Sequence, residues 1–467
     1  MDIVAPTANI TVQEQRTSEG LDTCVPMILR DGALYDPDLD RFFLDLPLNG
    51  MRSRHSLRAC GYDVVVWLRF LADARGKHVW QAERADVDAF HRARRRGDAR
   101  FRISAASWNR SVASLAKLYA WGEREHLITI APFTHRTVWR RGHGGRRAQL
   151  ASRNEAYERA AKRSDVRFIE LAAFRTFRDV GLRRLAVDGS ERPSARDRNG
   201  TRNALFAELL VTTGLRLEEA SFLLAFELSA LMSAGTPSRQ RRLELAAALT
   251  KGDRGRTVVL PSRLVPQISA YLQVERAGAV AKFAARQGPR QIDRPIFIRA
   301  PAPGAHSLVL LGGGTVPVDV LTPEERGRLV ICDEDGTPRE VAALWVSEVG
   351  QPVQPNSWEA IFARASRRCS EAGVPVQVTP HQLRHTFAVH MLAMLIQHRL
   401  REAATPAGPM QAYRELLGDP LQQVQQLLGH ASLATTYIYL EHIASRADTV
   451  DAAVEELLAL LPSAYAL

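Results

Sequence analysis

The sequence predicts a mainly α-helical protein with a small β-sheet component, an α+β fold divided into two domains. Its 467 residues exceed what one ordinary hydrophobic core accommodates, so two domains are expected. Apolar residues recur at helical spacing along most of the chain, and strand patterns interrupt the second half in two places. These three observations favour two helical domains, the second of which carries a small sheet.

The composition is that of a folded, water-soluble protein. Apolar residues make up 46% of the chain and charged residues 24%, a balance that argues against wholesale disorder. The sequence contains no run of about eighteen uncharged apolar residues, and the segment MDIVAPTANITVQEQ lacks the basic and apolar regions of an export signal. We therefore expect a cytoplasmic protein with no membrane partner.

The basic charge balance points to a polyanionic partner. The formal net charge is +11 and the isoelectric point is near 9.9. Each phosphate that a cation neutralises releases condensed counterions, which favours binding to nucleic acid. A GC-rich genome, which inflates the arginine content, is the alternative explanation. Only five of the 62 basic residues are lysines, namely Lys77, Lys117, Lys162, Lys251 and Lys282.

The four cysteines carry no recognisable pattern. They are scattered along the chain without a Cys-x-x-Cys pair, at Cys24, Cys60, Cys332 and Cys369. Neither a disulfide framework nor a cysteine zinc site is indicated.

Helical periodicity marks the first domain, residues 46–133. Helices are expected within the segments 53–76, 83–97 and 103–127. Residues 1–45 form an N-terminal extension with little periodicity, in which LYDPDLDRFFLDLPLNG suggests turns and a short docking segment.

A basic, glycine-bearing stretch, residues 134–164, is expected to be an interdomain linker that can lie along phosphates. The second domain then spans residues 165–467. Within it, LELAAALTKGDRGRTVVLP predicts a β-hairpin, because a Gly-Asp-Arg-Gly turn separates two apolar runs. A stretch rich in Pro, Gly and Val at about 288–350 predicts an irregular or β insertion.

Clustered arginines in the first domain and the linker are candidate DNA contacts. A solvated helix face explains such a run equally well. The candidates are Arg92, Arg94, Arg95, Arg96, Arg110, Arg140 and Arg141.

The segment LLVTTGLRLEEASFL, residues 209–223, places a charged residue in an apolar helical stretch. Arg216 needs a partner there, and Glu219, three residues on, lies on the same helix face. Taken alone, this segment favours a structural ion pair.

The segment TPHQLRHTFAVHML, residues 379–392, begins with a Thr-Pro helix start. His381 and Arg384 are three residues apart on one face, so their side chains can converge on one anion. His385 is four residues from His381, which makes a metal-binding pair the alternative. HQLRH lacks the glutamate of the zincin pattern, so no metal is expected.

Lys251 lies at the mouth of the predicted hairpin turn, where a lysine is usually solvated. Because the chain contains so few lysines, the presence of Lys251 at this turn has a second explanation. Lysine can lose its proton in a suitable environment whereas arginine in practice does not, so lysine can serve as a proton donor that is later regenerated.

Two tyrosines lie close together in LLGHASLATTYIYLEH, residues 427–442. Gly429 and His430 follow a helical run, and Tyr437 and Tyr439 lie on the next one. Residues two apart on a helix project in nearly opposite directions. At most one tyrosine therefore faces a given site, and the other packs or is solvated.

The order Arg, Lys, His-x-x-Arg, His and Tyr over residues 205–445 resembles the tyrosine recombinase family, also called phage integrases. The matching segments are TGLRLEEA, TKGDRGRTVVLP, TPHQLRHTFAVHML and LLGHASLATTYIYLEH. The resemblance implies a helical, SAM-like core-binding domain over residues 46–133 and an integrase-like catalytic domain. Two stretches depart from the family, the insertion at about 288–350 and QHRLREAATPAGPMQAYRELLGD before the Leu-Gly-His segment.

The resemblance also assigns roles to the matched residues. The family's nucleophile lies nine residues after the histidine of the Leu-Gly-His segment, which here is Tyr439, and Lys251 becomes the general acid for the leaving 5′ oxygen. The implied catalytic set, with Glu219 in support, is Arg216, Lys251, His381, Arg384, His430 and Tyr439.

These residue types suit cleavage of a DNA phosphodiester without a metal. Arginine forks bind the non-bridging oxygens, and histidines add donors or exchange the phenolic proton. The resemblance implies a covalent 3′-phosphotyrosyl intermediate. Because that linkage stores much of the broken bond's free energy, the 5′ hydroxyl of a second strand can reverse the step without ATP or another cofactor.

The function implied is site-specific recombination, for integration or excision of a mobile element. The implied partners are double-stranded DNA recombination sites, a homotetramer on paired sites, and accessory or directionality factors, at the bacterial nucleoid. The tail DTVDAAVEELLALLPSAY carries an apolar stripe that docks either on a neighbour or on its own chain. A topoisomerase IB-like relaxing enzyme and a catalytically silent DNA-binding regulator are the alternative functions.

Overall fold

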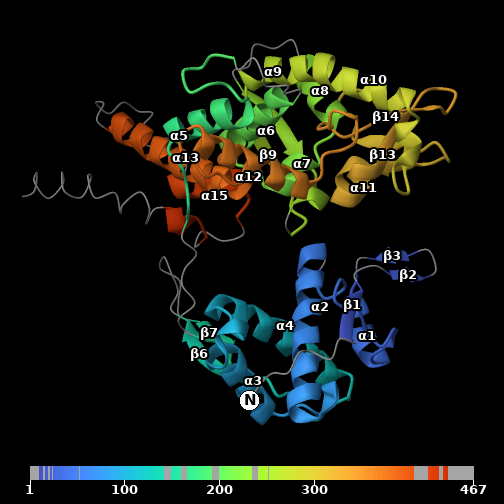
Figure 1. The fold of residues 1–467 in the computed structure, drawn as a ribbon, viewed down its shortest axis with the longest axis vertical. Helices are drawn as coiled ribbons and strands as arrows, with labels where there is room; N and C mark the ends of the chain where they lie inside the picture. The colour runs from blue at the N-terminus through green and yellow to red at the C-terminus, as the bar shows by residue number, and fades with distance from the viewer. Residues whose placement is uncertain are drawn as a thin grey trace, which may run out of the picture. The chain divides into compact units, whose positions relative to one another are not determined.

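In the computed structural model the chain forms two compact units, Met1–Ser164 and Asp165–Leu467 (Figure 1). The structure describes residues 10–13, 16–18, 21–23, 25–51, 53–140, 149–158, 166–191, 199–233, 240–250, 252–403, 419–430 and 435–439. Within these ranges, no helix combines the length and the apolar character that a bilayer crossing requires.

The first unit is mainly helical. Its α-helices are Pro37–Asp45 (α1), Arg54–Phe70 (α2), Arg84–Arg96 (α3) and Ala105–Arg124 (α4). One antiparallel sheet consists of Ile10–Gln13 (β1), Met27–Arg30 (β4) and Ala33–Leu34 (β5). Two antiparallel hairpins consist of Arg16–Ser18 (β2) with Leu21–Thr23 (β3), and His135–Arg140 (β6) with Gln149–Asn154 (β7). The three predicted helices are confirmed as α2, α3 and α4.

Aromatic side chains form the centre of the first unit's core. Trp67 of α2 is fully buried, and its indole Nε1 donates to the hydroxyl of Tyr119 in α4 over 2.7 Å. That hydroxyl in turn donates to the carbonyl oxygen of Val79 over 2.8 Å. Because buried Trp and Tyr polar groups require partners, this chain of bonds fixes α2 against α4.

The segment predicted to form turns near residue 40 is the helix α1. Asp36 precedes it as the N-cap, and its carboxylate accepts from the backbone N of Leu39 over 2.7 Å. Pro37 occupies the first helical turn, where its missing N–H costs nothing. The prediction of turns was wrong because Asp-Pro starts a helix as readily as it makes a turn.

The stretch predicted to be a linker contains the β6–β7 hairpin. Thr137, Val138 and Trp139 are strong strand formers that pair with Ser152, Ala151 and Leu150. Beyond the hairpin, Glu158 bonds to Arg95 of α3 over 2.7 Å. This part of the stretch therefore packs on the first unit.

The second unit is organised around α6, which is buried on almost all sides (Figure 1). Its α-helices are Leu171–Thr176 (α5), Gly200–Thr213 (α6), Leu217–Ser221 (α7), Ala225–Ser233 (α8), Leu264–Ala270 (α9), Ala277–Ala285 (α10), Pro323–Arg328 (α11), Pro355–Glu371 (α12), Pro380–Ala403 (α13) and Pro420–Leu428 (α15). Almost all residues of α6 are buried, and the chain turns into α7 at its C-terminal end.

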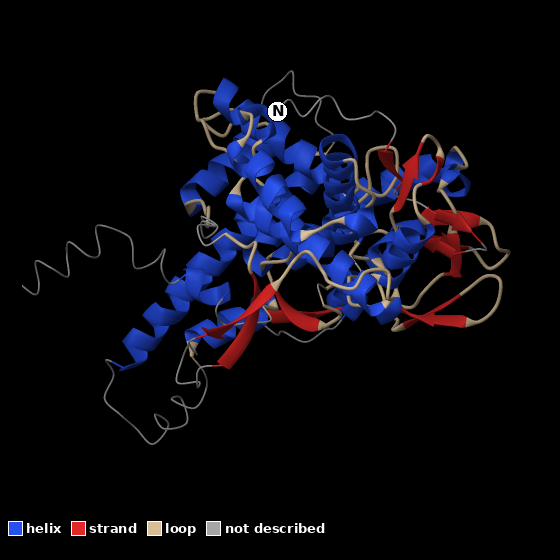
Figure 2. Cartoon of the chain, turned by 90° about the horizontal axis from the view of Figure 1, so that it is seen from below, coloured by secondary structure: helices blue, strands red, loops and turns tan. Residues whose placement is uncertain are grey.

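The second unit also contains small sheets. Figure 2 shows the strands of the chain as red arrows beside the blue helices. The predicted hairpin is confirmed as Gln240–Leu245 (β8) paired with Arg256–Pro261 (β9). Its connection is longer than predicted, because Ala247–Leu249 forms a 3-10 turn. In the predicted insertion, Ile296–Arg299 (β10) pairs parallel with Leu329–Cys332 (β13), which pairs antiparallel with Pro338–Val341 (β14). Ser307–Val309 (β11) and Thr315–Pro317 (β12) form a further antiparallel pair.

Candidate active site

Arg216 lies in the turn between α6 and α7. α6 ends at Gly214, whose φ of 67° is left-handed. A Cβ atom at Gly214 would also lie 2.4 Å from the ring of Phe387, so both the turn and the packing require glycine. Arg216 is the N-cap of α7 and not part of a helix, which corrects the expectation drawn from its apolar surroundings.

Glu219 fixes the orientation of Arg216. The Glu219 carboxylate accepts from the backbone N of Arg216 through Oε2 and from its Nη1 through Oε1, each over 2.7 Å. Glu219 is 1% exposed, so water competes little for these bonds. The ion pair predicted from the three-residue spacing is confirmed.

Arg384 joins three segments of the second unit. It lies on α13, is only 3% exposed, and donates from Nη1 to the carbonyl oxygen of Gly214 and from Nη2 to that of Leu428 over 2.6 Å. Burial and then the positive charge of Arg216 lower the pKa of Arg384 to about 9, so the guanidinium still carries its charge at neutral pH. The α6 end, α13 and the α15 end thus meet at one buried cation.

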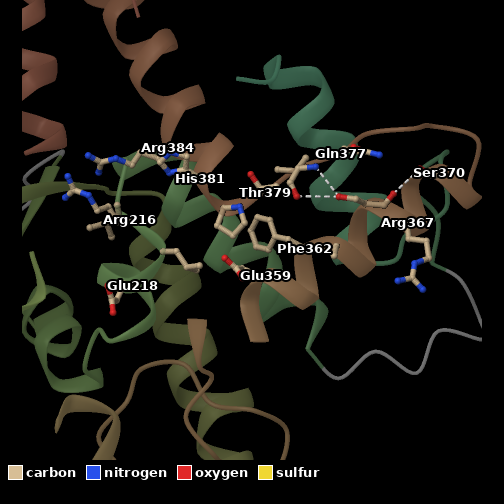
Figure 3. A pocket seen from close by; sticks show the side chains of 16 residues that line it. Arg216, Glu218, Glu359, Phe362, Arg367, Ser370, Gln377, Thr379, His381 and Arg384 are labelled. Atoms are coloured by element: carbon tan, nitrogen blue, oxygen red, sulfur yellow. Dashed lines mark hydrogen bonds between the residues drawn. The ribbon is translucent and has the colours of Figure 1, made fainter. Parts of the chain in front are cut away.

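Arg216, His381 and Arg384 line a cleft of about 800 Å³ and lie together on one side of it (Figure 3). His381 follows the first residue of α13, and the three-residue spacing sets it on the same face as Arg384, as predicted. Desolvation and then the charges of Arg384 and Arg216 lower the pKa of His381. The cleft therefore presents two cations and a neutral imidazole, an arrangement that suits a phosphate.

His430 follows the C-terminal end of α15. Gly429 ends that helix with a left-handed φ of 64°, and the backbone N of His430 donates to the carbonyl oxygen of Gln425 over 3.0 Å. The imidazole Nδ1 lies 3.1 Å from the hydroxyl of Thr436. Burial, followed by the charges of Arg384 and Arg216, lowers the pKa of His430 to about 4, so this side chain is neutral at pH 7.

The two tyrosines lie on a helical segment, residues 435–439, and differ sharply in environment. Tyr439 is 2% exposed, whereas Tyr437 is 41% exposed. The Tyr439 hydroxyl lies 3.0 Å from Nδ1 of His385, and its ring stacks on His430 at 6.1 Å between centroids. Burial raises the pKa of Tyr439, and the positive charges of Arg384 and Arg216 oppose that rise.

Three predicted features lie outside the described residues. They are Lys251, residues 404–418 of the stretch that departs from the family pattern, and the apolar stripe at Val450, Val454, Leu457 and Leu461. On either side of position 251, Thr250 is buried and Gly252 has a left-handed φ of 89°. The role of Lys251 stays a prediction.

Two family models match this chain. The model for the phage integrase N-terminal SAM-like domain matches residues 39–126, and the model for the phage integrase family matches residues 190–402. The chain belongs to the phage integrase family. The second match includes the positions of Arg216, His381 and Arg384, and it ends before His430 and Tyr439.

Curated relatives of this phage integrase family member are tyrosine recombinases. Tyrosine recombinase XerC of Ralstonia pickettii (strain 12J) is 33% identical over 144 residues, 29% of this chain and 36% of the relative. Tyrosine recombinase XerC of Methylobacterium sp. (strain 4-46) is 31% identical over 222 residues, 45% of this chain and 58% of the relative. The chain thus matches less than two thirds of the length of either relative.

A solved structure of the Tn1549 transposon integrase in complex with a circular intermediate DNA is also similar. It covers 90% of this chain and 98% of that chain, with 14% sequence identity and a TM-score of 0.46.

Arg256 was not among the residues predicted from the sequence, yet it also binds the carboxylate of Glu219. Its Nη1 and Nη2 donate to Oε1 and Oε2 of Glu219 over 2.8 and 2.6 Å. The signal that identifies it is the alternation along β9, where Arg256 shares a face with the buried Val258 and Leu260. An arginine on an apolar strand face needs a buried acid as its partner.

Glu219→Gln is expected to destabilise the second unit at neutral pH. Burial raises the pKa of Glu219, but the bond and charge of Arg256 and the charge of Arg216 outweigh this and lower it to about 2 from 4.5. The ionised carboxylate therefore contributes stability that is complete above about pH 4.5 and lost as the pH falls through about 2. The difference of about 2.5 pKa units corresponds to about 3 kcal/mol. Urea unfolding at several pH values measures this loss of stability, and hydrogen exchange of the α6 amides serves as the probe for the second unit.

Glu218→Gln is the matched control for that measurement. Glu218 is the exposed neighbour on α7, so its replacement is expected to change the unfolding free energy by less than about 0.5 kcal/mol at every pH. An equal loss in both variants, or a Glu219→Gln loss that does not shrink towards pH 2, contradicts the prediction.

Two of the arginines predicted as DNA contacts already carry ion pairs within the first unit. Arg95 donates to Glu158 over 2.7 Å, and Arg110 donates to Asp63 over 3.0 Å. Asp63 is buried and also accepts from Ser111 over 2.8 Å. These pairs favour the structural explanation for both arginines.

The other predicted contacts carry no ion pair described above or lie outside the described residues. Arg92 and Arg96 of α3 are exposed, and Arg94 between them is half-buried. The side chain of Arg140, at the end of β6, and the whole of Arg141 lie outside the described residues. DNA binding by this group stays a prediction.

The rings of His381 and His385 lie edge to face, 4.3 Å apart. In the part of the chain that the structure describes, no group of three or more His, Cys, Asp or Glu side chains is arranged to hold a metal ion. Cys60, Cys332 and Cys369 are buried thiols without a disulfide, and Cys24 lies outside the described residues.

Proposed function

We propose that this chain is a site-specific DNA recombinase, an enzyme that cleaves and rejoins DNA strands through a covalent 3′-phosphotyrosyl intermediate during integration or excision of a mobile element. One observation carries the proposal. Arg216 and Arg384, from distant segments, line a single cleft, and the Tyr439 hydroxyl is bonded to the residue that follows Arg384 on α13. Membership in the phage integrase family supports the same chemistry.

The arginines supply the charge that a phosphodiester requires. Both guanidinium groups present planar forks that suit the two non-bridging oxygens of a phosphate. Each is already oriented, Arg216 by Glu219 and Arg384 by two carbonyl oxygens. Because these donors need no reorganisation, their bonds strengthen as negative charge accumulates on the pentavalent transition state.

Tyr439 is the proposed nucleophile. An ordinary phenol has a pKa of about 10, so only roughly 0.1% is ionised at pH 7, a deficit of about 4 kcal/mol. Burial of Tyr439 increases this deficit, while the charges of Arg384 and Arg216 reduce it. The neutral histidines His381 and His430 serve as donors to the phosphate oxygens.

Lys251 is the proposed general acid for the departing 5′ oxygen. The attack of Tyr439 exchanges one phosphodiester for another of similar free energy, so the 5′ hydroxyl of a second strand can reverse the step. No ATP, metal or other cofactor enters this scheme. The phosphotyrosyl intermediate persists until a 5′ hydroxyl attacks it. When that hydroxyl belongs to the second strand, the product is an exchanged strand.

The proposed partners follow from this chemistry. The substrate is double-stranded DNA with paired recombination sites, and the protein acts as a homotetramer with accessory or directionality factors, at the bacterial nucleoid. The exposed arginines of α3 and the net charge of +11 support binding to the DNA backbone.

Covalent trapping tests the proposed function. Nicked duplexes tiled across the DNA that flanks the gene are incubated with the protein in a metal chelator and resolved on a denaturing gel. We expect one duplex to form a protein–DNA adduct, and two intact copies of its site to yield Holliday junctions. If the protein forms the adduct and relaxes supercoiled DNA but yields no Holliday junctions, it is a topoisomerase. If it binds the DNA tightly and forms no adduct, it is a silent regulator.

A further inference from the structure

His385 is the side chain that meets the hydroxyl of Tyr439. It follows Arg384 on α13, and its Nδ1 lies 3.0 Å from the phenolic oxygen. The two rings are 5.6 Å apart between centroids and inclined by 54°. This is a hydrogen-bonding distance between a potential base and the atom that the proposed function makes the nucleophile.

The other histidines of the site are engaged elsewhere. Nδ1 of His430 lies 3.1 Å from the Thr436 hydroxyl, and the His430 ring stacks against the face of Tyr439. The His381 side chain lines the cleft and contacts the ring of His385. His385 is therefore better placed than either to exchange a proton with the phenol.

The surroundings of Tyr439 make a contacting base necessary. The side chain is 2% exposed and packs in an apolar cluster with Phe387, Ala388, Val424 and Leu428. It is not among the residues that line the cleft. A phenol so enclosed has little access to bulk water, so its proton has to pass first to a protein group.

We propose, on the basis of the recombinase function above, that His385 is a further catalytic residue, the base that accepts the phenolic proton of Tyr439. The step starts from a neutral imidazole with its proton on Nε2, so that the Tyr439 hydroxyl donates to Nδ1. As the Oη–P bond forms, this proton moves to Nδ1. The P–O5′ bond breaks, and the 5′ oxygen takes a proton from the proposed acid Lys251. Rejoining runs the same transfers backwards, so His385 returns its proton to Oη.

His385→Asn separates proton acceptance from simple positioning. The asparagine amide can occupy the place of Nδ1 and bind the phenol, but it does not take a proton. The substrate is a nicked duplex with a sulfur in place of the leaving 5′ oxygen, which needs no general acid, so the measured rate reports nucleophilic attack. We expect adduct formation to slow by roughly a hundredfold, with DNA affinity unchanged.

His390→Asn is the matched control. His390 lies on the same helix, with its Nε2 3.3 Å from the Ile169 carbonyl oxygen, away from Tyr439. We expect its rate to stay within about twofold of the unsubstituted enzyme. Incorporation of a fluorinated, more acidic tyrosine at position 439 is expected to restore most of the rate lost in His385→Asn, because such a phenol depends less on a base. A purely structural role for His385 predicts no such rescue.

The outcomes distinguish this inference from the proposed function. If the unsubstituted enzyme forms no adduct, the recombinase function itself fails. If the unsubstituted enzyme forms the adduct and His385→Asn forms it at the same rate, the proposed role of His385 is wrong. The role is also wrong if His385→Asn is slow and the more acidic tyrosine does not restore its rate. Should His385→Asn lose DNA affinity or melt early, His385→Gln with the same rescue arm decides the question.

Discussion

Tyr439→Phe is expected to abolish the covalent protein–DNA adduct, while Tyr437→Phe retains it. The substitution removes the single oxygen that forms the bond to phosphorus, so the rate of adduct formation should fall by at least roughly 10⁴-fold. The phenylalanine ring fills the same buried space, and the lost bond to His385 costs only about 1 kcal/mol. A nicked duplex resolved on a denaturing gel measures the adduct.

Tyr437 provides the comparison because it differs from Tyr439 mainly in direction. It lies two residues away on the same helical segment and is 41% exposed. Both variants should bind the duplex with the affinity of the unsubstituted protein, which shows that the fold is intact. An adduct that persists in Tyr439→Phe but disappears in Tyr437→Phe would transfer the nucleophile to Tyr437.

Local spacing was enough to predict part of the site. His381 and Arg384 share a face of α13 because residues three apart on a helix are neighbours. Arg216 and Glu219 have the same spacing, but they meet as the N-cap and the third residue of α7. Tyr439 is buried and Tyr437 is exposed because residues two apart on a helix project in nearly opposite directions. In each case the relevant contact depends on a few consecutive residues.

The contacts that complete the site join distant segments, and spacing does not encode them. Arg256 reaches Glu219 from β9, and Arg384 reaches carbonyl oxygens at the ends of α6 and α15. His385 seemed in the sequence only a partner for a metal pair with His381, because its true neighbour Tyr439 lies far along the chain. The packing of α13 against α6 and α15 brings the partners of Arg384 together, and the packing of β9 and α7 against α6 does so for Arg256 and Glu219.

The same limit applies to the first unit. Asp36 and Pro37 were interpreted as a turn, although a cap and a first-turn proline describe them equally well. The choice between the two depends on Leu39, Phe42 and Phe43 of α1, which are buried in the core of the first unit. Burial of one helix face is a tertiary effect that decides between alternatives of similar local free energy.

Arg384→Lys is expected to reduce adduct formation by roughly 10²–10³-fold, although it conserves the charge. A lysine ammonium is a point donor that cannot bridge the two carbonyl oxygens and also present a fork to a phosphate. One buried carbonyl oxygen then loses its partner, which lowers the unfolding free energy by about 1–3 kcal/mol. Single-turnover trapping and urea unfolding measure the two effects separately.

Arg202→Lys controls for the loss of stability. Arg202 is 4% exposed, against 3% for Arg384, and donates to the Val346 carbonyl oxygen and to the Asn203 side chain within the same unit. Its replacement should cost a similar unfolding free energy and leave the rate of adduct formation within about threefold, at a temperature where both variants are folded. Equal losses of rate in the two variants would mean that Arg384 acts through the stability of the unit. A loss confined to Arg384→Lys requires that its guanidinium acts on the phosphate, because the two arginines are matched in burial and each gives up bonds to buried oxygen atoms.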